Sequence, residues 1–214
     1  MAKRPIRGAA DLIPKRSTLT SVRAAAKGCR ACDLWKCGTQ TVFGEGARQA
    51  AVMFVGEQPG NDEDLSGHPF VGPAGKLLDR ALADAGISRA DAYVTNVVKH
   101  FKWEPRGKRR IHQRPNTEEI RACRPWFEAE IERVKPSVVL CLGATAAQAL
   151  IGPTFRVTRQ HGILFPSAFG PMIAATVHPA SILRAPDAEA RELAFGGFVA
   201  DLRSLAEASV QSGS

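Results

Sequence analysis

Four short apolar runs alternate along the chain with longer segments that have the spacing or capping residues of helices. The apolar runs are residues 51–55, 92–98, 137–142 and 173–177. The helical segments are residues 76–85, 116–134, 144–150 and 188–208. Runs this short suit buried strands, and strands that alternate with helices predict a mainly parallel sheet covered on both faces. We therefore expect an α/β fold with three layers, α/β/α, around a central four-stranded sheet.

The length sets the domain organisation. A chain of 214 residues can bury one α/β core, with little left for a second. We expect residues 1–16 to form a basic, irregular tail and residues 17–209 to form a single domain. Ser17 and Thr18 suit the cap of a short helix ending near Gly28.

Polar residues follow three of the predicted strands. Glu57 and Gln58 come after the first strand, in a glycine-rich loop, Asn96 lies at the end of the second and His178 follows the fourth. Because the carboxyl ends of parallel strands meet at one edge of a sheet, these four side chains are expected to line one pocket. Each taken singly has an ordinary structural explanation, so the functional signal is their convergence.

Two nucleotide-binding motifs are excluded. Gly75-Lys76 is followed by Leu77 where a phosphate-binding P-loop needs Ser or Thr, and Phe70 occupies the place of its first glycine. No G-x-G-x-x-G sequence follows a predicted strand, which argues against a dinucleotide site.

The charge is concentrated in two blocks. The formal net charge is +8, yet residues 1–30 and 99–114 are so basic that the rest of the chain has an acidic excess. Such blocks are typical of a surface that binds a polyanion, although the first alone is better explained as a solvated tail. No apolar run is long enough for a membrane span, and no apolar signal core follows the basic start, so we expect a cytoplasmic protein.

The cysteines favour metal binding over disulfides. The five are Cys29, Cys32, Cys37, Cys123 and Cys141. An odd number, without an export signal, argues against a disulfide framework. Cys29-x-x-Cys32 is a weak signal by itself, and Cys141 lies within a predicted buried strand, so the residues alone leave the ligand set open.

Several ordered motifs resemble the family-4 uracil-DNA glycosylases. They are C-x-x-C at 29–32, G-E-x-P-G at 56–60, P-F-V-G-P-A-G-K at 69–76, T-N-x-V-K at 95–99 and H-P-x-S at 178–181. The resemblance implies an α/β/α fold that carries a 4Fe-4S cluster. The basic insertion at 105–115, together with Gln58, resembles the UdgX subgroup in particular.

The resemblance implies a ligand set and a partner. Carried over by position, the cluster ligands are Cys29, Cys32, Cys123 and His100, which stands where the family has a cysteine. Cys37 is the alternative fourth ligand. The expected partner is uracil-containing DNA, single-stranded with double-stranded as a second option; free uracil is the product, and the protein is expected to be a monomer.

The resemblance also gives roles to the pocket residues. Phe70 would stack on the uracil ring, Asn96 would read its polar edge, and His178 would donate toward O2, where charge gathers as the base leaves. Gln58 would support the site through its backbone and side chain. Lys108, Arg109 and Arg110 would position the basic loop and contact phosphates, and Arg114 would also bind DNA.

His112 is the residue that sets the UdgX subgroup apart. There a histidine on the basic loop bonds to the sugar C1′, so His112 would form a stable covalent adduct with DNA. Imidazole is a good nucleophile when neutral, the form that predominates for an unperturbed histidine at pH 7. Glu57 would orient His112 and accept its proton.

Two other functions stay open. The first is an ordinary family-4 glycosylase that turns over, with His112 a surface histidine in a phosphate-binding loop. The other alternative is a non-catalytic iron-sulfur module that binds DNA.

Overall fold

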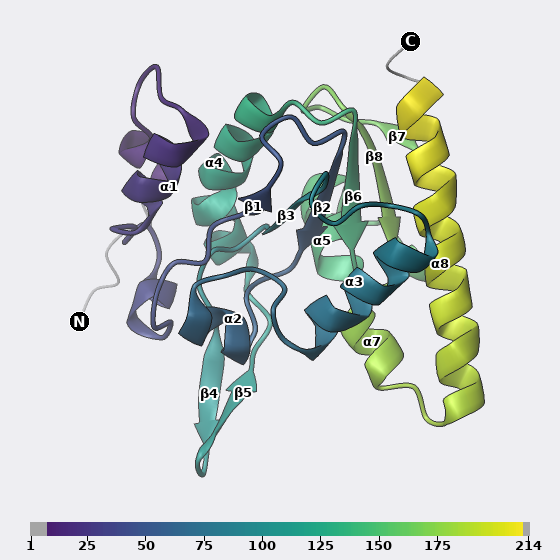
Figure 1. Cartoon of the computed structure of the whole chain (residues 1–214). Coiled ribbons are helices and arrows are strands. Elements are labelled where there is room, and N and C mark those ends of the chain that lie inside the picture. Colours follow the sequence, from purple (N-terminus) through teal and green to yellow (C-terminus); the bar gives the residue numbers. More distant parts are fainter. Residues whose placement is uncertain (1–7, 212–214) are drawn as a thin grey trace.

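A six-stranded sheet forms the centre of the molecule, a computed structural model that describes residues 8–211 (Figure 1). The strands lie in the order β1-β3-β2-β6-β8-β7. They are β1 (Glu45–Gly46), β2 (Val52–Gly56), β3 (Tyr93–Asn96), β6 (Val138–Leu142), β7 (Phe165–Pro166) and β8 (Met172–Thr176). The four predicted strands are the parallel centre β3-β2-β6-β8, and β1 and β7 add antiparallel edges. These edge strands have two residues each, too few for an alternating pattern to predict.

Helices cover both faces of this sheet, which confirms the predicted α/β/α layers. The helices are α1 (Leu19–Ala26), α2 (Asn61–Ser66), α3 (Pro73–Asp84), α4 (Thr117–Val134), α5 (Ala144–Leu150), α6 (Val157–Gln160), α7 (Pro179–Leu183) and α8 (Ala188–Gln211), with 3-10 turns η1 (Ala9–Leu12) and η2 (Asp33–Lys36). One core lies under α4 and α5, and the other lies under α3 and α8. None of the described helices is long and apolar enough to cross a membrane.

Successive residues of the central strands enter opposite cores. On β2, Met53 and Val55 pack toward α4 and α5, whereas Phe54 packs toward α3 and α8. Since side chains alternate across a strand, both faces of a doubly covered sheet must be apolar. This explains why these strands appear in the sequence as continuous apolar runs.

The cap predicted for α4 is present. The Asn116 side chain accepts a hydrogen bond from the Glu119 amide at 2.9 Å, and the Glu119 carboxylate accepts from the Asn116 amide at 2.7 Å. Helix α3 begins earlier than predicted, because Pro73 fits the first helical turn, where no amide donor is needed. The short helices α2 and α7 were not predicted.

The predicted basic loop is a β-hairpin. Strands β4 (Trp103–Arg106) and β5 (Arg109–His112) pair antiparallel, with Trp103 opposite His112. Gly107 has a φ of 59°, a left-handed backbone that favours glycine at the turn. The hairpin extends away from the sheet (Figure 1).

The amino-terminal segment packs against α4. Turn η1 and helix α1 both contact α4, and Ala9 is fully buried. The predicted irregular tail thus contains one regular element, since residues 9–12 form a 3-10 turn of which Ala9 is buried, while residues 1–7 lie outside the described part of the chain.

Candidate active site

A cavity of about 590 Å³ opens at the carboxyl ends of the parallel strands. In the register, Gly56 at the end of β2 lies opposite Asn96 at the end of β3, and β8 delivers His178 nearby. The predicted residues that line the cavity are Glu57, Gln58, Phe70, Asn96, His112 and His178. The sequence prediction that the strand ends converge is thus met, and the hairpin adds His112.

Two glycines allow the cavity wall to close. A Cβ atom at Gly56 would lie 2.3 Å from Asn96 Oδ1 and 2.8 Å from Phe70 Cζ. At Gly75 it would lie 1.7 Å from the carbonyl oxygen of Phe70. Phe70 itself has a φ of 58°, which is uncommon for a bulky residue and is held by this packing. The glycines therefore fix the position of the Phe70 ring.

Glu63 ties the two glycine-rich loops together. Its two carboxylate oxygens accept hydrogen bonds from the Gly60 amide at 3.0 Å and the Gly72 amide at 2.8 Å. The side chain is buried, and the bonds satisfy amides at the start of α2 and α3. The sequence reasoning missed this residue.

His112 and Glu57 are in contact at the mouth of the cavity. His112 Nε2 lies 3.1 Å from Glu57 Oε1, with the imidazole half exposed and the carboxylate mostly buried. Burial alone would raise the pKa of Glu57, but His112 and the hydroxyl of Thr145 outweigh it and hold that pKa below its ordinary value. Glu57 is therefore a carboxylate at neutral pH.

Thr145 was not predicted. It comes shortly after the end of β6. The expectation that polar residues at the ends of parallel strands line one pocket, which selected Asn96 and His178, would also have found it. It lines the cavity and stabilises the ionised form of Glu57.

His178 is a neutral hydrogen-bond donor in this setting. Burial lowers the pKa of its imidazole to about 4, against the opposing attraction of Glu57. Its Nδ1 accepts a hydrogen bond from the Ala180 amide at 3.1 Å, so the single proton of the neutral ring sits on Nε2. The ring stacks on Phe70 with 6.5 Å between centroids. His178 Nε2–H is thus available for a ligand.

Asn96 rests on a buried ion pair. Lys99 Nζ donates to the carbonyl oxygen of Asn96 at 2.7 Å and also to Glu130, and both charged side chains are fully buried. Within residues 8–211, no hydrogen bond engages the side-chain amide of Asn96, which lines the cavity. Its backbone is therefore fixed while its amide is open to a ligand.

Gln58 holds the base of the hairpin. Its Nε2 donates to the carbonyl oxygens of Lys102 and Gln113 at 3.2 and 3.0 Å, and its Oε1 accepts from the Lys102 amide at 3.1 Å. These residues flank β4 and β5, so the side chain bridges both strands. The structure gives Gln58 a positioning contact rather than a free polar edge in the cavity.

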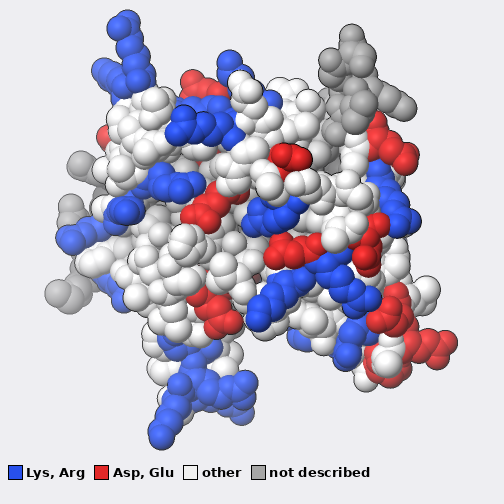
Figure 2. All heavy atoms as spheres, viewed as in Figure 1, with Lys and Arg blue, Asp and Glu red and all other residues white. Residues whose placement is uncertain are grey.

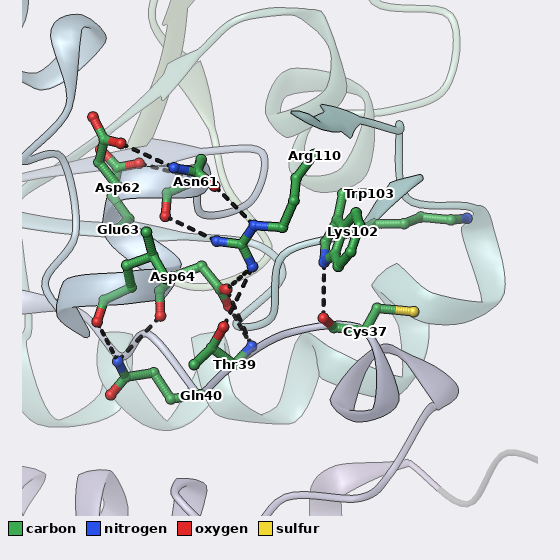
Figure 3. A network of polar contacts seen from close by, with 12 residues as sticks. Cys37, Thr39, Gln40, Asn61, Asp62, Glu63, Asp64, Lys102, Trp103 and Arg110 are labelled. Carbon is green, nitrogen blue, oxygen red and sulfur yellow. Dashed lines mark hydrogen bonds and ion pairs between the residues drawn. The ribbon is translucent and has the colours of Figure 1, made fainter. Parts of the chain in front are cut away.

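Arg110 attaches the hairpin to α2. Its guanidinium donates to Asp64 Oδ2 at 2.7 Å, to Asn61 Oδ1 at 2.8 Å and to the Asn61 carbonyl oxygen at 3.3 Å (Figure 3). Asp64 is fully buried, and its carboxylate also accepts from the Thr39 amide. Arg110 was predicted to position the loop and to contact phosphate; these contacts agree with the positioning role, and they already occupy the guanidinium.

Trp103 provides a second attachment. Its indole donates to the carbonyl oxygen of Cys37 at 2.8 Å (Figure 3). The Arg110 guanidinium lies 5.3 Å from the ring centroids of both Trp103 and Phe101. The hairpin is therefore fixed to the body from several sides.

The remaining predicted DNA-binding residues are exposed. Lys108 and Arg109 stand at the hairpin tip, where Figure 2 shows basic side chains gathered at the bottom of the view. Arg114 lies beyond the hairpin and donates to Gln148 Oε1 at 2.9 Å. The tip can contact a polyanion without disturbing His112.

Three of the four predicted cluster ligands lie together. Cys29, Cys32 and Cys123 all belong to the core under α4 and influence one another electrostatically, and burial raises the pKa of Cys32 to about 11 and that of Cys123 to about 12. Trp126 Nε1 donates to Cys29 Sγ and the Lys99 amide donates to Cys123 Sγ, both at 3.2 Å. Buried thiols that receive such bonds fit the thiolate ligands of an iron-sulfur cluster.

The predicted fourth ligand, His100, contacts a different side chain. His100 is buried, and its Nε2 lies 3.1 Å from Thr41 Oγ1. Cys37, the alternative, has an exposed thiol. Over the described range, no three His, Cys, Asp or Glu side chains form a set that could hold a single metal ion.

Comparison with known proteins agrees with this geometry. A family model described as the uracil DNA glycosylase superfamily matches residues 43–203. The chain is 39% identical over 165 residues to a type-4 uracil-DNA glycosylase of Archaeoglobus fulgidus, covering 74% of this chain and 79% of that protein. It is 38% identical over 173 residues to a type-4 uracil-DNA glycosylase of Thermotoga maritima, covering 80% and 86% respectively.

Proposed function

The chain belongs to the uracil-DNA glycosylase superfamily, and we propose that it removes uracil from DNA and then stays bound to the abasic sugar through His112. The observation that carries the proposal is the 3.1 Å contact between His112 Nε2 and Glu57 Oε1 at the mouth of the cavity. A nucleophile and its base within hydrogen-bond reach are the signature of covalent catalysis.

Recognition of uracil is assigned to the sheet edge. An enzyme that acts on a base must draw it out of the stack and grip its edge. Phe70 offers a face for stacking, and the amide of Asn96 can both donate and accept, which suits the adjacent carbonyl and N–H of uracil. The site thus has a planar contact and a polar contact for one base.

Departure of the base is assigned to His178. As the C1′–N1 bond breaks, its electron pair goes to the uracil ring and negative charge gathers at O2. A neutral imidazole that donates from Nε2 stabilises this charge without needing a proton from solvent. The lowered pKa of His178, a result of burial, keeps the imidazole in this form.

Capture is assigned to His112 with Glu57. From the doubly protonated ring, the Glu57 carboxylate accepts the Nε2 proton, which leaves a neutral imidazole with a lone pair on Nε2. This lone pair bonds to C1′ as the C1′–N1 bond breaks, the uracil anion takes the proton from Glu57, and the alkylated ring loses its Nδ1 proton to solvent. The product is an N-alkylated imidazole, which has no easy hydrolytic route. The hydrogen bonds of Gln58, Arg110 and Trp103 attach the hairpin to the body of the protein. They favour a His112 that is already in position before DNA binds.

A 4Fe-4S cluster is proposed as a structural element. Cys29, Cys32 and Cys123 would hold it, with His100 as the fourth ligand after rotation away from Thr41. The cluster would link the amino-terminal segment to α4 and to the residues after β3. No catalytic step is assigned to it.

The experiment is a denaturing gel. Single-stranded DNA with one uracil is incubated with the protein, and the sample is boiled in detergent before electrophoresis. A band that carries both protein and DNA is expected, and it should be absent with His112→Ala. No shifted band, or a band that survives in the variant, rejects covalent capture.

A turnover glycosylase is the second candidate, since the relatives carry the name type-4 uracil-DNA glycosylase. It predicts that one protein molecule releases many uracil molecules. The ratio of uracil released to protein present, measured in the same reaction, separates the two candidates.

A further inference from the structure

A second cavity lies beside the first. It has a volume of about 370 Å³ and sits between α4 and α5. Its lining has an apolar part, which consists of Val97, Ile120, Phe127, Ala149, Leu150 and Pro153. Its charged part is Arg114, Arg121 and Arg124, and none of the described residues that line it is acidic. An apolar floor with a cationic rim suits a flat ligand that carries a negative charge.

The rim follows from the spacing of residues on α4. Ile120 and Arg121 follow Thr117 by three and four residues, and Arg124 follows them by four and three, so all four face the same side of the helix. Arg124 donates to Glu128 at 2.9 Å and Arg114 donates to Gln148 at 2.9 Å. Arg121 has no hydrogen bond or ion pair to any described residue, which leaves its guanidinium open to a ligand.

The two cavities adjoin at one residue. Thr145 lines both, and it also contacts Glu57. His112 lines the first cavity and Arg114 the second, and two residues of extended chain span roughly 7 Å. A DNA strand that places one nucleotide at His112 therefore brings its neighbour to the second cavity.

We propose that the second cavity is a DNA subsite that holds the base and phosphate of a nucleotide next to the uracil. The inference rests on the proposed function, because it assumes that uracil enters the first cavity. The base packs on the apolar floor, and Arg121 with Arg114 pairs with the phosphate. Such a subsite favours single-stranded DNA, in which the neighbouring base is free to leave its stack.

The test measures uracil release at protein concentrations below saturation. The DNA probes are single strands with one uracil, in which each neighbour on either side is replaced in turn by an abasic tetrahydrofuran nucleotide. At one neighbour position, loss of the base should slow the wild type by about tenfold. Ala149→Phe, which fills the cavity, should be slow with every probe and insensitive to this replacement.

Arg121→Ala keeps the test independent of core packing. It should weaken binding and lower the slope of log affinity against log salt by about 0.7, while the rate at saturating protein stays unchanged. Arg191→Ala is the matched control, because Arg191 is an exposed arginine on α8, on the opposite face of the sheet. It should bind like the wild type.

A failure of the proposed function can be told apart from a failure of the subsite. If the wild type releases no uracil from any probe, the proposed function is wrong. If it releases uracil but no abasic replacement slows it, or if Arg121→Ala and Arg191→Ala have the same salt slope as the wild type, the subsite is rejected.

Discussion

The edge of the sheet and the β4–β5 hairpin contribute to the same cavity but are held in different ways. Asn96 and His178 follow buried parallel strands, so the backbone ladder of the sheet fixes them. His112 stands on a two-stranded element attached mainly by side chains, through Gln58, Arg110 and its own contact with Glu57. The rigid edge suits recognition of a base, and the attached hairpin suits delivery of a reactive group.

We propose that this difference separates two chemical tasks. Groups that stabilise the leaving base must be placed accurately in both the free and bound protein, which a central sheet ensures. A group that bonds to the sugar is needed only after the base is gripped. Variants of the hairpin should therefore alter the fate of the sugar, whereas variants of the sheet edge should alter excision itself.

The largest effect is expected from His112→Ser. The serine leaves space beside Glu57, so water can attack C1′ in place of the imidazole, with Glu57 as its base. The covalent band should disappear completely, and uracil release should exceed the amount of protein. Quantifying free uracil against total protein checks this, and a variant that neither captures nor releases would contradict the division of tasks.

The next effect belongs to the sheet edge. His178→Ala removes the donor that we propose acts on the leaving base, and loss of one such donor slows catalysis by about 10²- to 10³-fold. Both uracil release and capture should slow together in single-turnover reactions. If capture falls while release stays fast, His178 does not act on the leaving base.

A smaller effect is expected from Arg110→Ala, which detaches the hairpin from α2. Capture should slow by about ten- to a hundredfold through misplacement of His112, while uracil release persists. The buried Asp64 also loses its cation, which should lower the free energy of unfolding by about 1–3 kcal/mol in urea titrations.

Arg110→Lys is the matched control for that variant. It keeps the charge beside Asp64 but cannot bond to Asn61 and Asp64 together, so it should restore stability more than capture. Wild-type capture by Arg110→Ala would show that the hairpin does not need this attachment.

The smallest effect concerns pH. The folded-state pKa of His178 is lowered to about 4 by burial, so in acid the unfolded chain binds a proton there before the folded chain does. Stability from this group is present at neutral pH and lost as pH falls from about 6.5 toward 4. Between pH 7 and 5, His178→Gln should lose less unfolding free energy than the wild type, by on the order of 1 kcal/mol. Parallel acid curves would contradict this.

The sequence alone determined the sheet centre and the strand-end residues. Continuous apolar runs, capping residues such as Asn116 and polar residues at strand ends are local patterns, and the rule for parallel sheets joins their ends at one edge. Asn96 and His178 could therefore be placed in one cavity. Thr145 obeys the same rule and was within reach of it.

Only the tertiary structure decided which partners the side chains of the hairpin contact. Arg110 and Asp64 are 46 positions apart, and no local pattern tells that this arginine pairs with a buried carboxylate while Lys108 and Arg109 remain exposed. Nor does the sequence show that the amide of Gln58 binds the hairpin backbone, or that the ring of His100 turns to Thr41. Periodicity and capping depend on neighbours in the chain, whereas the partner of a charged or polar side chain depends on what folding brings beside it.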